Sequence, residues 1–451
     1  MNHNLIKRIF LIIPVLFALA ASVAEAAIPA AERQALTDIY NGTGGAGWTD
    51  NSGGWVGFVG DECTWFGVTC NGAGDTVTAI DLHTNNLVGS LPATLNNLTG
   101  LFTFFVQNNQ LTGPIPSLAG LTNLAYFSVG NNQLTGPIPS SLAGLTNLVN
   151  FYVHDNQLTG SIPSLVGLTN LAQFYAQNNQ LTGSIPPLAG LTNLVNFGVN
   201  NNQLTGPIPP LAGMTSLADF IVNNNQLTGS IPPLAGLTGL VNFYAYNNQL
   251  TGPIPSLAGL TNLAYFSVNN NQLTGPIPPL AGLTNLVYFG VNNNQLTGPI
   301  PSLTGLTNLV QFRVNNNQLS GPIPSLAGLT GLANFYAYNN QLTGPIPSLA
   351  GLDNLVQFRV NNNQLSGDVP AVPAPTNALL ASGSSLCPNY LNHTADAAWD
   401  AATGSTPWYA QCTAAPIPVA AAPIPTLSQW GMIVLSILLV GAAVFGLRRQ
   451  R

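Results

Sequence analysis

Hydrophobic and polar positions recur along most of the chain with a period of 23 or 24 residues. One unit, Leu121 to Ser140, reads LTNLAYFSVGNNQLTGPIPS, and close copies precede and follow it. The leucine of its NNQL phrase has these equivalents: Leu87, Leu111, Leu134, Leu158, Leu181, Leu204, Leu227, Leu250, Leu273, Leu296, Leu319, Leu342 and Leu365. Ten of the twelve steps are 23 residues long and two are 24. Such a period predicts a solenoid, in which each unit buries its apolar face against its neighbours.

Within each unit the first half predicts a short strand. Phe127 and Val129 alternate with Tyr126 and Ser128, which is the period of a strand with one face in the core. Asn132 follows where the chain must turn inward. Its amide can form hydrogen bonds with backbone groups of adjacent coils that strand pairing would leave without partners. Stacked asparagines should therefore form an internal ladder.

The second half of each unit predicts extended or 3₁₀-like structure. Its GPIP phrase cannot be helical, because each proline removes a donor and restricts the residue before it, and Ile138 should point inward. Two units, at LPATLNNL and IPSSLAGL, keep one residue that the others lack on this side. We therefore expect thirteen stacked coils in a comparatively flat array with little helix.

The frame of these units resembles the plant-type leucine-rich repeat, L-x-x-L-x-x-L-x-L-x-x-N-x-L followed by LTGPIP, over residues 76–368. The resemblance implies a leucine-rich-repeat solenoid of about 13 repeats. Its concave face should be a parallel β-sheet, its convex side extended or 3₁₀, and its N-terminal cap should hold a short helix. The concave sheet is the usual binding surface of this fold.

Both ends of the array need caps, since terminal coils would otherwise expose core. Residues 27–75 supply a helix-like stretch and apolar cover from Trp48, Trp55 and Trp65. Their CTWFGVTC phrase resembles the N-terminal cap of plant-type leucine-rich-repeat proteins, and this resemblance implies a disulfide between Cys63 and Cys70.

The opposite cap is expected at residues 369–412. Trp399, Trp408 and a bridge between Cys387 and Cys412 would seal the last coil. An even number of cysteines in an exported chain favours disulfides, and no histidine flanks either pair at zinc-ligand spacing. We therefore expect no metal and no cofactor.

The N-terminal residues predict export. Lys7 and Arg8 precede an apolar run that ends in AEA, so residues 1–26 read as a secretory signal peptide; a permanent membrane helix is the alternative. Near the other end, residues 413–423 form a Pro/Ala linker. Met432 to Leu447 is almost wholly apolar and precedes a basic cluster, which predicts a membrane helix with its C-terminus in the cytoplasm.

Residues 424–451 also resemble the IPTL-CTERM sorting signal of Gram-negative bacteria. The resemblance rests on a short motif, one membrane helix and the terminal basic cluster, in that order. The motif residues are Ile424, Pro425, Thr426, Leu427, Trp430 and Gly431. It implies recognition by a membrane sorting enzyme of the exosortase type and delivery to the cell surface; a plain single-pass anchor is the alternative.

Charge excludes one class of partner. Only 5% of the 451 residues are charged and the net charge is −6. Between the two termini the basic residues are Arg33, Arg313 and Arg359, and a phosphate backbone requires clustered Lys and Arg. Nucleic acid is therefore not an expected partner.

The residues that differ between units lie at outward strand positions, and most of them carry aromatic rings or amides. We expect ligand-binding residues on the concave face at Tyr152, Tyr175, Tyr244, Tyr246, Arg313, Tyr336, Tyr338 and Arg359. Such surfaces suit sugars and protein ligands alike. The two arginines, about 10 Å apart by strand spacing, could grip an acidic group. The alternative is that duplication simply copied a solvated surface.

Catalysis is not expected. His154 and Asp155 are adjacent, so a regular strand would point them to opposite faces, and neither they nor His83 with Asp81 have a nucleophile nearby in the pattern. No phosphate loop or dinucleotide fingerprint occurs. We expect an exported, non-catalytic surface protein that binds a protein or glycan partner, in adhesion, matrix or host contact. The alternatives are a structural spacer or coat without a discrete ligand, and an ice-binding protein.

Overall fold

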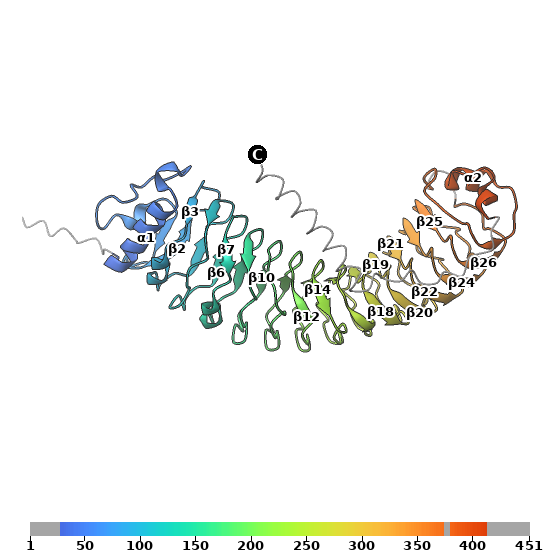
Figure 1. Ribbon diagram of the computed structural model, residues 1–451, viewed down its shortest axis with the longest axis horizontal. Helices are drawn as coiled ribbons and strands as arrows, with labels where there is room; N and C mark the ends of the chain where they lie inside the picture. Colours follow the sequence, from blue (N-terminus) through green and yellow to red (C-terminus); the bar gives the residue numbers. More distant parts are fainter. Residues whose placement is uncertain (1–27, 374–378, 413–451) are drawn as a thin grey trace, which may run out of the picture.

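The structure, a computed structural model, describes residues 28–373 and 379–412 and is a bowed solenoid (Figure 1). Thirteen coils each contribute one parallel strand to an inner sheet, as the period predicted. These strands are β2 (Val77–Asp81), β4 (Thr103–Phe105), β6 (Tyr126–Ser128), β8 (Asn150–Tyr152), β10 (Gln173–Tyr175), β11 (Asn196–Gly198), β13 (Asp219–Ile221), β15 (Asn242–Tyr244), β17 (Tyr265–Ser267), β19 (Tyr288–Gly290), β21 (Gln311–Arg313), β23 (Asn334–Tyr336) and β25 (Gln357–Arg359). The leucine-rich-repeat solenoid expected from the sequence is confirmed.

Neighbouring coils lie in register. Each strand pairs residue for residue with its equivalent in the next coil, so Phe127 opposes Phe151 and Phe151 opposes Phe174. The only antiparallel partner in this sheet, within the described residues, is β1 (Val68–Cys70), which pairs with β2 at the N-terminal end.

The convex side is extended, as expected from its prolines. Its strands are β3 (Val88–Ser90), β5 (Gln110–Thr112), β7 (Thr135–Pro137), β9 (Gln157–Thr159), β12 (Thr205–Pro207), β14 (Gln226–Thr228), β16 (Thr251–Pro253), β18 (Gln272–Gly275), β20 (Gln295–Gly298), β22 (Gln318–Gly321), β24 (Gln341–Gly344), β26 (Gln364–Gly367) and β27 (Tyr390–Leu391). The last seven form one sheet from β16 to β27. Two 3₁₀ helices, η3 (Ala93–Asn97) and η4 (Ser140–Gly144), fall in the two coils that keep the extra residue. Loss of that residue therefore coincides with loss of the 3₁₀ turn.

The core is a column of identical side chains. The rings of Phe104 through Phe358, one per coil, are fully buried and stack with centroids 5.4–5.7 Å apart. Ile138 and its equivalents close the convex side and are also buried. Burial of this apolar surface is the main favourable contribution to the stability of such a stack.

A buried ladder of asparagines runs beside the phenylalanines, as predicted for Asn132 and its equivalents. In one coil Asn271 Nδ2 donates to the carbonyl oxygen of Ala245 at 3.0 Å, and also to those of Val268 and Asn269 in its own coil. Its Oδ1 accepts from Leu250 N at 2.9 Å. One amide thus satisfies backbone groups of two coils where no strand reaches them.

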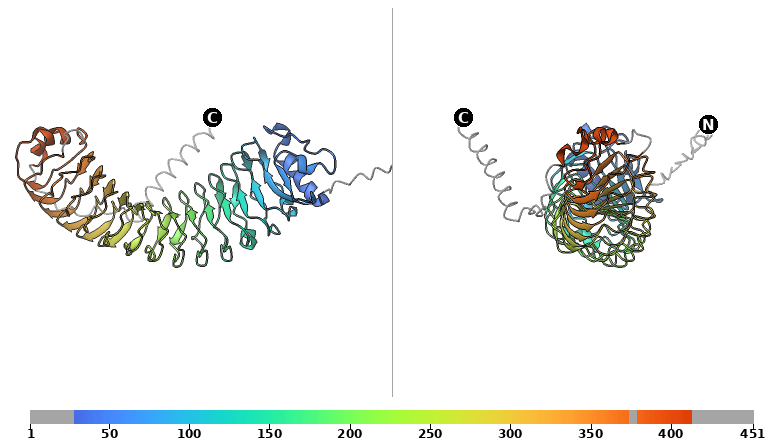
Figure 2. Two further views of the ribbon diagram at one scale, coloured as in Figure 1. Left: turned by 180° about the vertical axis from the view of Figure 1, so that it is seen from behind. Right: turned by 90° about the vertical axis from the view of Figure 1, so that its right-hand side faces the viewer.

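The expectation of a comparatively flat array is wrong. Figures 1 and 2 show the array bowed, with the inner sheet on the concave side and both caps raised toward the same side. Hydrogen bonds hold the inner strands about 4.8 Å apart, whereas the phenylalanine rings behind them are 5.4–5.7 Å apart. Neighbouring coils are thus farther apart at the phenylalanine rings than at the inner strands, and the stack of coils curves toward the side of the sheet.

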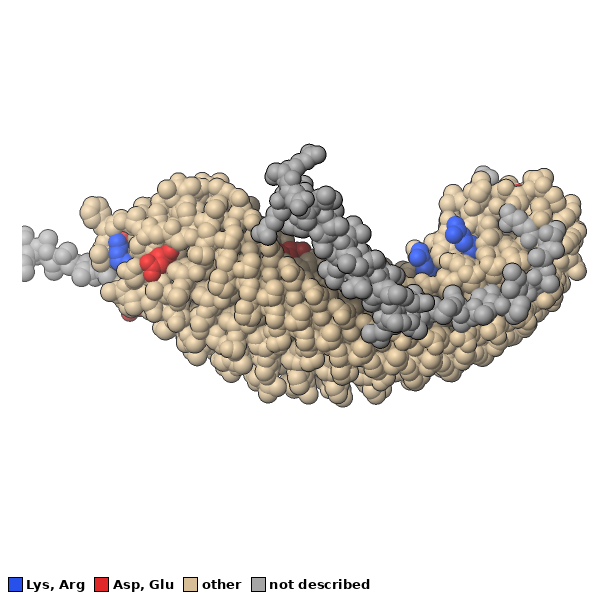
Figure 3. Space-filling view, in the orientation of Figure 1, with Lys and Arg blue, Asp and Glu red and all other residues tan. Residues whose placement is uncertain are grey.

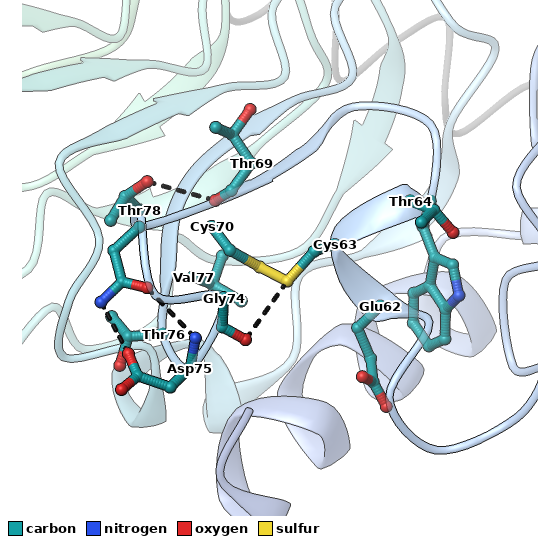
Figure 4. The surroundings of a disulfide bond; sticks show 12 residues. Glu62, Cys63, Thr64, Thr69, Cys70, Gly74, Asp75, Thr76, Val77 and Thr78 are labelled. Carbon is teal, nitrogen blue, oxygen red and sulfur yellow. Dashed lines mark hydrogen bonds between the residues drawn. A yellow bond between two sulfur atoms is a disulfide. The ribbon is translucent and has the colours of Figure 1, made fainter. Parts of the chain in front are cut away.

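The N-terminal cap confirms the expected helix, apolar cover and disulfide. It comprises α1 (Ala30–Gly42), η1 (Gly45–Gly47) and η2 (Glu62–Thr64), with its tryptophans buried. Buried Glu32 accepts from Val77 N at 2.7 Å, which ties α1 to the first coil. The Cys63–Cys70 bridge, with Cα atoms 5.5 Å apart, joins η2 to the β1–β2 hairpin (Figure 4).

The C-terminal cap is built as expected around tryptophans and the second disulfide. It contains α2 (Ala397–Thr403), η5 (Trp408–Gln411) and the Cys387–Cys412 bridge. The buried Trp399 ring lies 6.4 Å from that of Phe358, so it covers the last ring of the core column.

The predicted signal peptide, Pro/Ala linker, membrane helix and sorting motif lie outside the described residues. Across residues 28–373 and 379–412, no helix has the length and apolar character needed to cross a membrane.

We predict that Asn271→Ala lowers the free energy of unfolding by about 2–4 kcal/mol, at roughly 1 kcal/mol for each of its backbone hydrogen bonds. Chemical denaturation followed by circular dichroism measures the change. Gln272→Ala is the matched control, because its side chain makes no hydrogen bond to any other residue that the structure describes. Equal stability of the two variants would contradict a structural role for the buried ladder.

Candidate ligand-binding face

The concave face is the solvent-facing side of the inner sheet. In each coil it comprises the residues on either side of the core phenylalanine and the two residues after the next core position; around Phe127 and Val129 these are Tyr126, Ser128, Gly130 and Asn131. All eight residues predicted to bind ligand lie on it, and all are partly exposed. Charged side chains are rare in the whole chain, at 5% of its residues, and the flank of the solenoid seen in Figure 3 shows only a few of them outside the grey atoms. Recognition by this surface must therefore depend mainly on rings, amides and hydroxyls.

One column of the concave face has a structural role that the sequence reading missed. Asn131 and its equivalents in the following coils adopt positive φ values of 52–56°, a region that asparagine and aspartate tolerate. Their amides also bond one another; Asn224 Nδ2, for example, donates to Asn201 Oδ1 at 2.5 Å. Backbone conformation and this exposed ladder account for the repeated asparagine without a ligand.

The same turn overturns the expected separation of His154 and Asp155. Asp155 has φ 53°, outside regular strand geometry, and its Oδ2 lies 2.7 Å from His154 Nδ1. His83 and Asp81 are also in contact, with Nδ1 of the histidine 2.5 Å from Oδ1 of the aspartate. Within the described part of the chain, no three His, Cys, Asp or Glu side chains gather to hold a metal. The absence of catalysis remains a prediction.

Tyr152 and Tyr175 form a small cluster in the N-terminal half. Their ring centroids are 5.5 Å apart, and the hydroxyl of Tyr175 accepts from Asn196 Nδ2 at 2.7 Å. The hydroxyl of Tyr152 donates to Gln173 of the next coil. Burial is the main reason that the pKa of each phenol is raised.

A larger cluster lies in the central coils, where Tyr244 and Tyr246 meet two rings that the sequence reading did not select. Tyr265 and Tyr288 precede the core phenylalanine of the next two coils, and the Tyr244 and Tyr265 centroids are 6.4 Å apart. With Ser267 and Asn269, the four rings line a hollow of about 330 Å³.

The signal for the two missed tyrosines is the residue two positions later. Tyr265 is followed by Ser267 and Tyr288 by Gly290, and a small residue there leaves room for a ring. A Cβ on Gly290 would lie 2.6 Å from the Tyr288 ring, so the glycine is required for that ring's position.

Beyond the hollow, the two predicted arginines are brought together around a ring. The Arg313 guanidinium lies 5.1 Å from the centroid of Tyr336 and that of Arg359 lies 5.4 Å from it. Arg313 also lies 5.8 Å from Tyr288. The arginines were expected to hold an acidic group between them, but the ring of Tyr336 occupies that position. Rings and guanidinium groups therefore alternate along the face, in the order Tyr288, Arg313, Tyr336 and Arg359.

A second hollow, of about 540 Å³, lies beside β4, β6 and β8 and was not expected. Gly100, Phe102, Asn123, Ala125, Asn147, Val149 and Asn170 line it. Its asparagines hold the preceding coil: Asn147 Nδ2, for example, donates to the carbonyl oxygen of Thr122 at 2.8 Å. Those amides are therefore already used in stacking.

Comparison with known proteins matches two parts of the chain. The Leucine Rich Repeat family model matches residues 123–145, and the IPTL-CTERM motif model matches residues 422–451. A receptor protein kinase of Oryza sativa subsp. japonica, WSS1, is 34% identical over 109 residues, which are 24% of this chain and 11% of the relative.

Solved structures show the same fold over more of the chain. The plant peptide hormone receptor RGFR1, in complex with RGF2, has a TM-score of 0.63 and 29% identity over 69% of this chain and 55% of its own. A TDR receptor has a TM-score of 0.57 and 26% identity over 71% and 66%. The chain thus spans only part of the relatives it matches.

Burial raises the pKa of Tyr244 to about 12, and the neighbouring Tyr265, Asp219, Tyr246 and Tyr288 add to the shift. An exposed phenol in the unfolded chain ionises near pH 10. The contribution of Tyr244 to stability is therefore fully present below about pH 10 and lost as the pH rises toward about 12.

We predict that the free energy of unfolding falls less between about pH 10 and about pH 12 in Tyr244→Phe than in the parent protein. Urea denaturation of both proteins at about pH 9 and about pH 11.5 measures it, since only the parent can ionise at this position. An equal loss in both proteins would contradict the assignment.

Proposed function

We propose that this plant-type leucine-rich-repeat chain is an exported, non-catalytic binding protein of the bacterial cell surface. It takes a protein or glycan partner on its concave face, in adhesion, matrix or host contact. The residues proposed to bind are the eight predicted from the sequence together with Tyr265 and Tyr288.

The observation that carries this proposal is the concentration of rings and arginines in the C-terminal half of the concave face. Neither the core nor the amide ladders need them, since other coils stack equally well with serine, glycine or isoleucine at these positions. Large aromatic side chains and arginine are the residue types that contribute most binding energy at interfaces. Their surplus on one face is therefore evidence of a ligand.

The comparisons support the proposal by analogy of fold. The RGFR1 structure holds a solenoid of this type in complex with RGF2. Fold alone does not determine function, so the partner must be inferred from the side chains of this face.

The match to the IPTL-CTERM motif supports delivery to the surface. We propose that a sorting enzyme of the exosortase type recognises the region from Ile424 to Gly431, after export directed by the N-terminal segment. Anchoring through the apolar segment 432–447 belongs to the same proposal.

A structural spacer is the second candidate, favoured by the near identity of the coils and by ladders that continue through the array. The ice-binding alternative depends on a flat array of polar rows, and the bow of the concave sheet weakens it.

We predict that replacing Tyr244, Tyr246, Tyr336 and Tyr338 by alanine abolishes binding in a glycan array and in a pull-down with the full chain. The stacking contacts would be lost while the core remains intact. A control variant changes four exposed threonines of the convex side, Thr228, Thr251, Thr274 and Thr297, to alanine. Equal binding by both variants would count against the concave face.

Deleting residues 251–296 separates the binding hypothesis from the spacer hypothesis. This removes two complete 23-residue periods, including Tyr265 and Tyr288, and leaves the coils able to stack. We expect the deletion to lose binding, whereas deletion of residues 182–227, also two periods, should retain it. A spacer would tolerate both deletions alike in a surface-display or coat-thickness assay.

A further inference from the structure

The hollow formed by Tyr244, Tyr246, Tyr265 and Tyr288 differs from the other aromatic sites of the concave face in its hydrogen bonding. The hydroxyls of Tyr152, Tyr175 and Tyr336 are bonded to amide side chains. Within the described residues, none of the four hydroxyls at the hollow has such a bond. They can therefore donate and accept toward a ligand without breaking contacts within the protein.

The rings of the hollow offer apolar surface at two angles. Tyr244 makes edge-on contacts with Tyr246, at 69°, and with Tyr265, at 61°. Ser267 is the strand partner of Tyr244 and donates to Asn269 Oδ1 at 2.6 Å. The hollow's volume of about 330 Å³ is at the lower end of the usual range for small-molecule sites, about 300–1,000 Å³.

Arg313 stands at one end of this hollow without an acidic partner. Its guanidinium is held between the rings of Tyr288 and Tyr336 at 5.8 and 5.1 Å. Its Nε is buried, and no hydrogen bond or ion pair reaches it within residues 28–373 and 379–412. Arg359 is different, because its Nε donates to the carbonyl oxygen of Gly383 at 2.9 Å.

The carboxylate nearest the hollow lies at its opposite end. Asp219 is on β13, next to β15, and already accepts from Asn242 Nδ2 at 2.6 Å. The site therefore runs from a bonded carboxylate, across four neutral rings, to an arginine that lacks an acceptor.

We propose that this hollow and Arg313 form a subsite for a uronic-acid residue of an anionic polysaccharide. The C–H face of the sugar ring packs on the tyrosines, its hydroxyls bond the phenol and amide groups, and its carboxylate accepts from the guanidinium. This assignment deepens the proposed function and rests on it.

Three features favour an acidic sugar. Four hydroxyls without protein partners match a ligand rich in hydroxyls, whereas an apolar ligand would leave them unbonded. A neutral sugar would leave the positive charge of the Arg313 guanidinium, held between two rings, without an anionic partner. The Tyr336 and Tyr338 pair beyond Arg313 supplies further aromatic surface, which suits a polymer that continues along the face.

Calorimetric titration of the full chain with three hexamers tests the assignment: oligomannuronate, its methyl ester, and the neutral mannose hexamer. A hydrogen bond between charged groups contributes more than a neutral one, so we expect the acid to bind roughly ten- to a hundredfold more tightly than the ester. The ester keeps the ring and its hydroxyls and replaces the charged carboxylate by a neutral, slightly larger group; the mannose hexamer removes the charge without that added bulk.

Arg313→Met should remove the preference, so that the acid and the ester bind with similar affinity, because methionine keeps part of the packing without the charge. Arg313→Lys should restore part of the preference. Arg359→Met is a comparison on the same face and should change the preference less, because the Nε of Arg359 already donates to the carbonyl oxygen of Gly383.

Tyr265→Ala with Tyr288→Ala should remove binding of all three hexamers, with folding checked by circular dichroism. The inference is overturned if the acid and its ester bind the parent equally, if Arg313→Met leaves their ratio unchanged, or if only peptides bind. If no hexamer binds but the four-tyrosine variant still loses its partner in the pull-down, the uronic-acid assignment fails and the proposed function stands. If neither assay detects binding to the parent, both fail.

Discussion

The structure depends on one repeated interaction, the bond that each buried asparagine makes to backbone groups of its own coil and the coil before it. Inner strands are only a few residues long, so the turn that follows each of them has no strand partner. At Asn271 one side chain donates to three carbonyl groups and accepts from one amide. A buried backbone group without a partner costs about 1–3 kcal/mol, and thirteen stacked turns would multiply that cost. The ladder removes it and fixes the register in which the phenylalanines stack.

A frame determined in this way leaves few positions free to vary, and the proposed binding residues lie at those positions. The exposed column of Asn131 and its equivalents is committed to a left-handed turn and to a ladder of its own. Only the residues beside each phenylalanine and the first residue after the next core position can vary. In the C-terminal half they include tyrosines and two arginines among amides and small residues, held by the sheet with spacings that the strands determine. A rigid arrangement of this kind reduces the ordering cost of binding, which is the advantage of a solenoid as a recognition surface.

Most features of the fold could be predicted from the sequence, because the repeat period and the apolar positions within it determine which side chains form the core. The alternation around Phe127, the ladder at Asn132, the extended phrase at Ile138 and both disulfides follow from patterns or resemblance that recur along the chain. The bow could not be predicted, since it arises from the difference between ring spacing and strand spacing. The contact of Asp155 with His154 depends on a positive φ value, and the hollow at Tyr265 and Tyr288 depends on the small residues Ser267 and Gly290 two positions later. Backbone angles, ring spacing and room for a side chain are not visible in the alternation of apolar and polar residues.

Native-state hydrogen exchange of the leucine amides that donate to the buried asparagines tests the central claim most directly. These amides include those of Leu227, Leu250 and Leu273. If the ladder holds the coils in register, they should exchange slowly and at similar rates through the central coils, as slowly as the amides of the neighbouring strands. Rapid exchange at these leucines beside protected strands would show that the turns open independently, and would contradict the account.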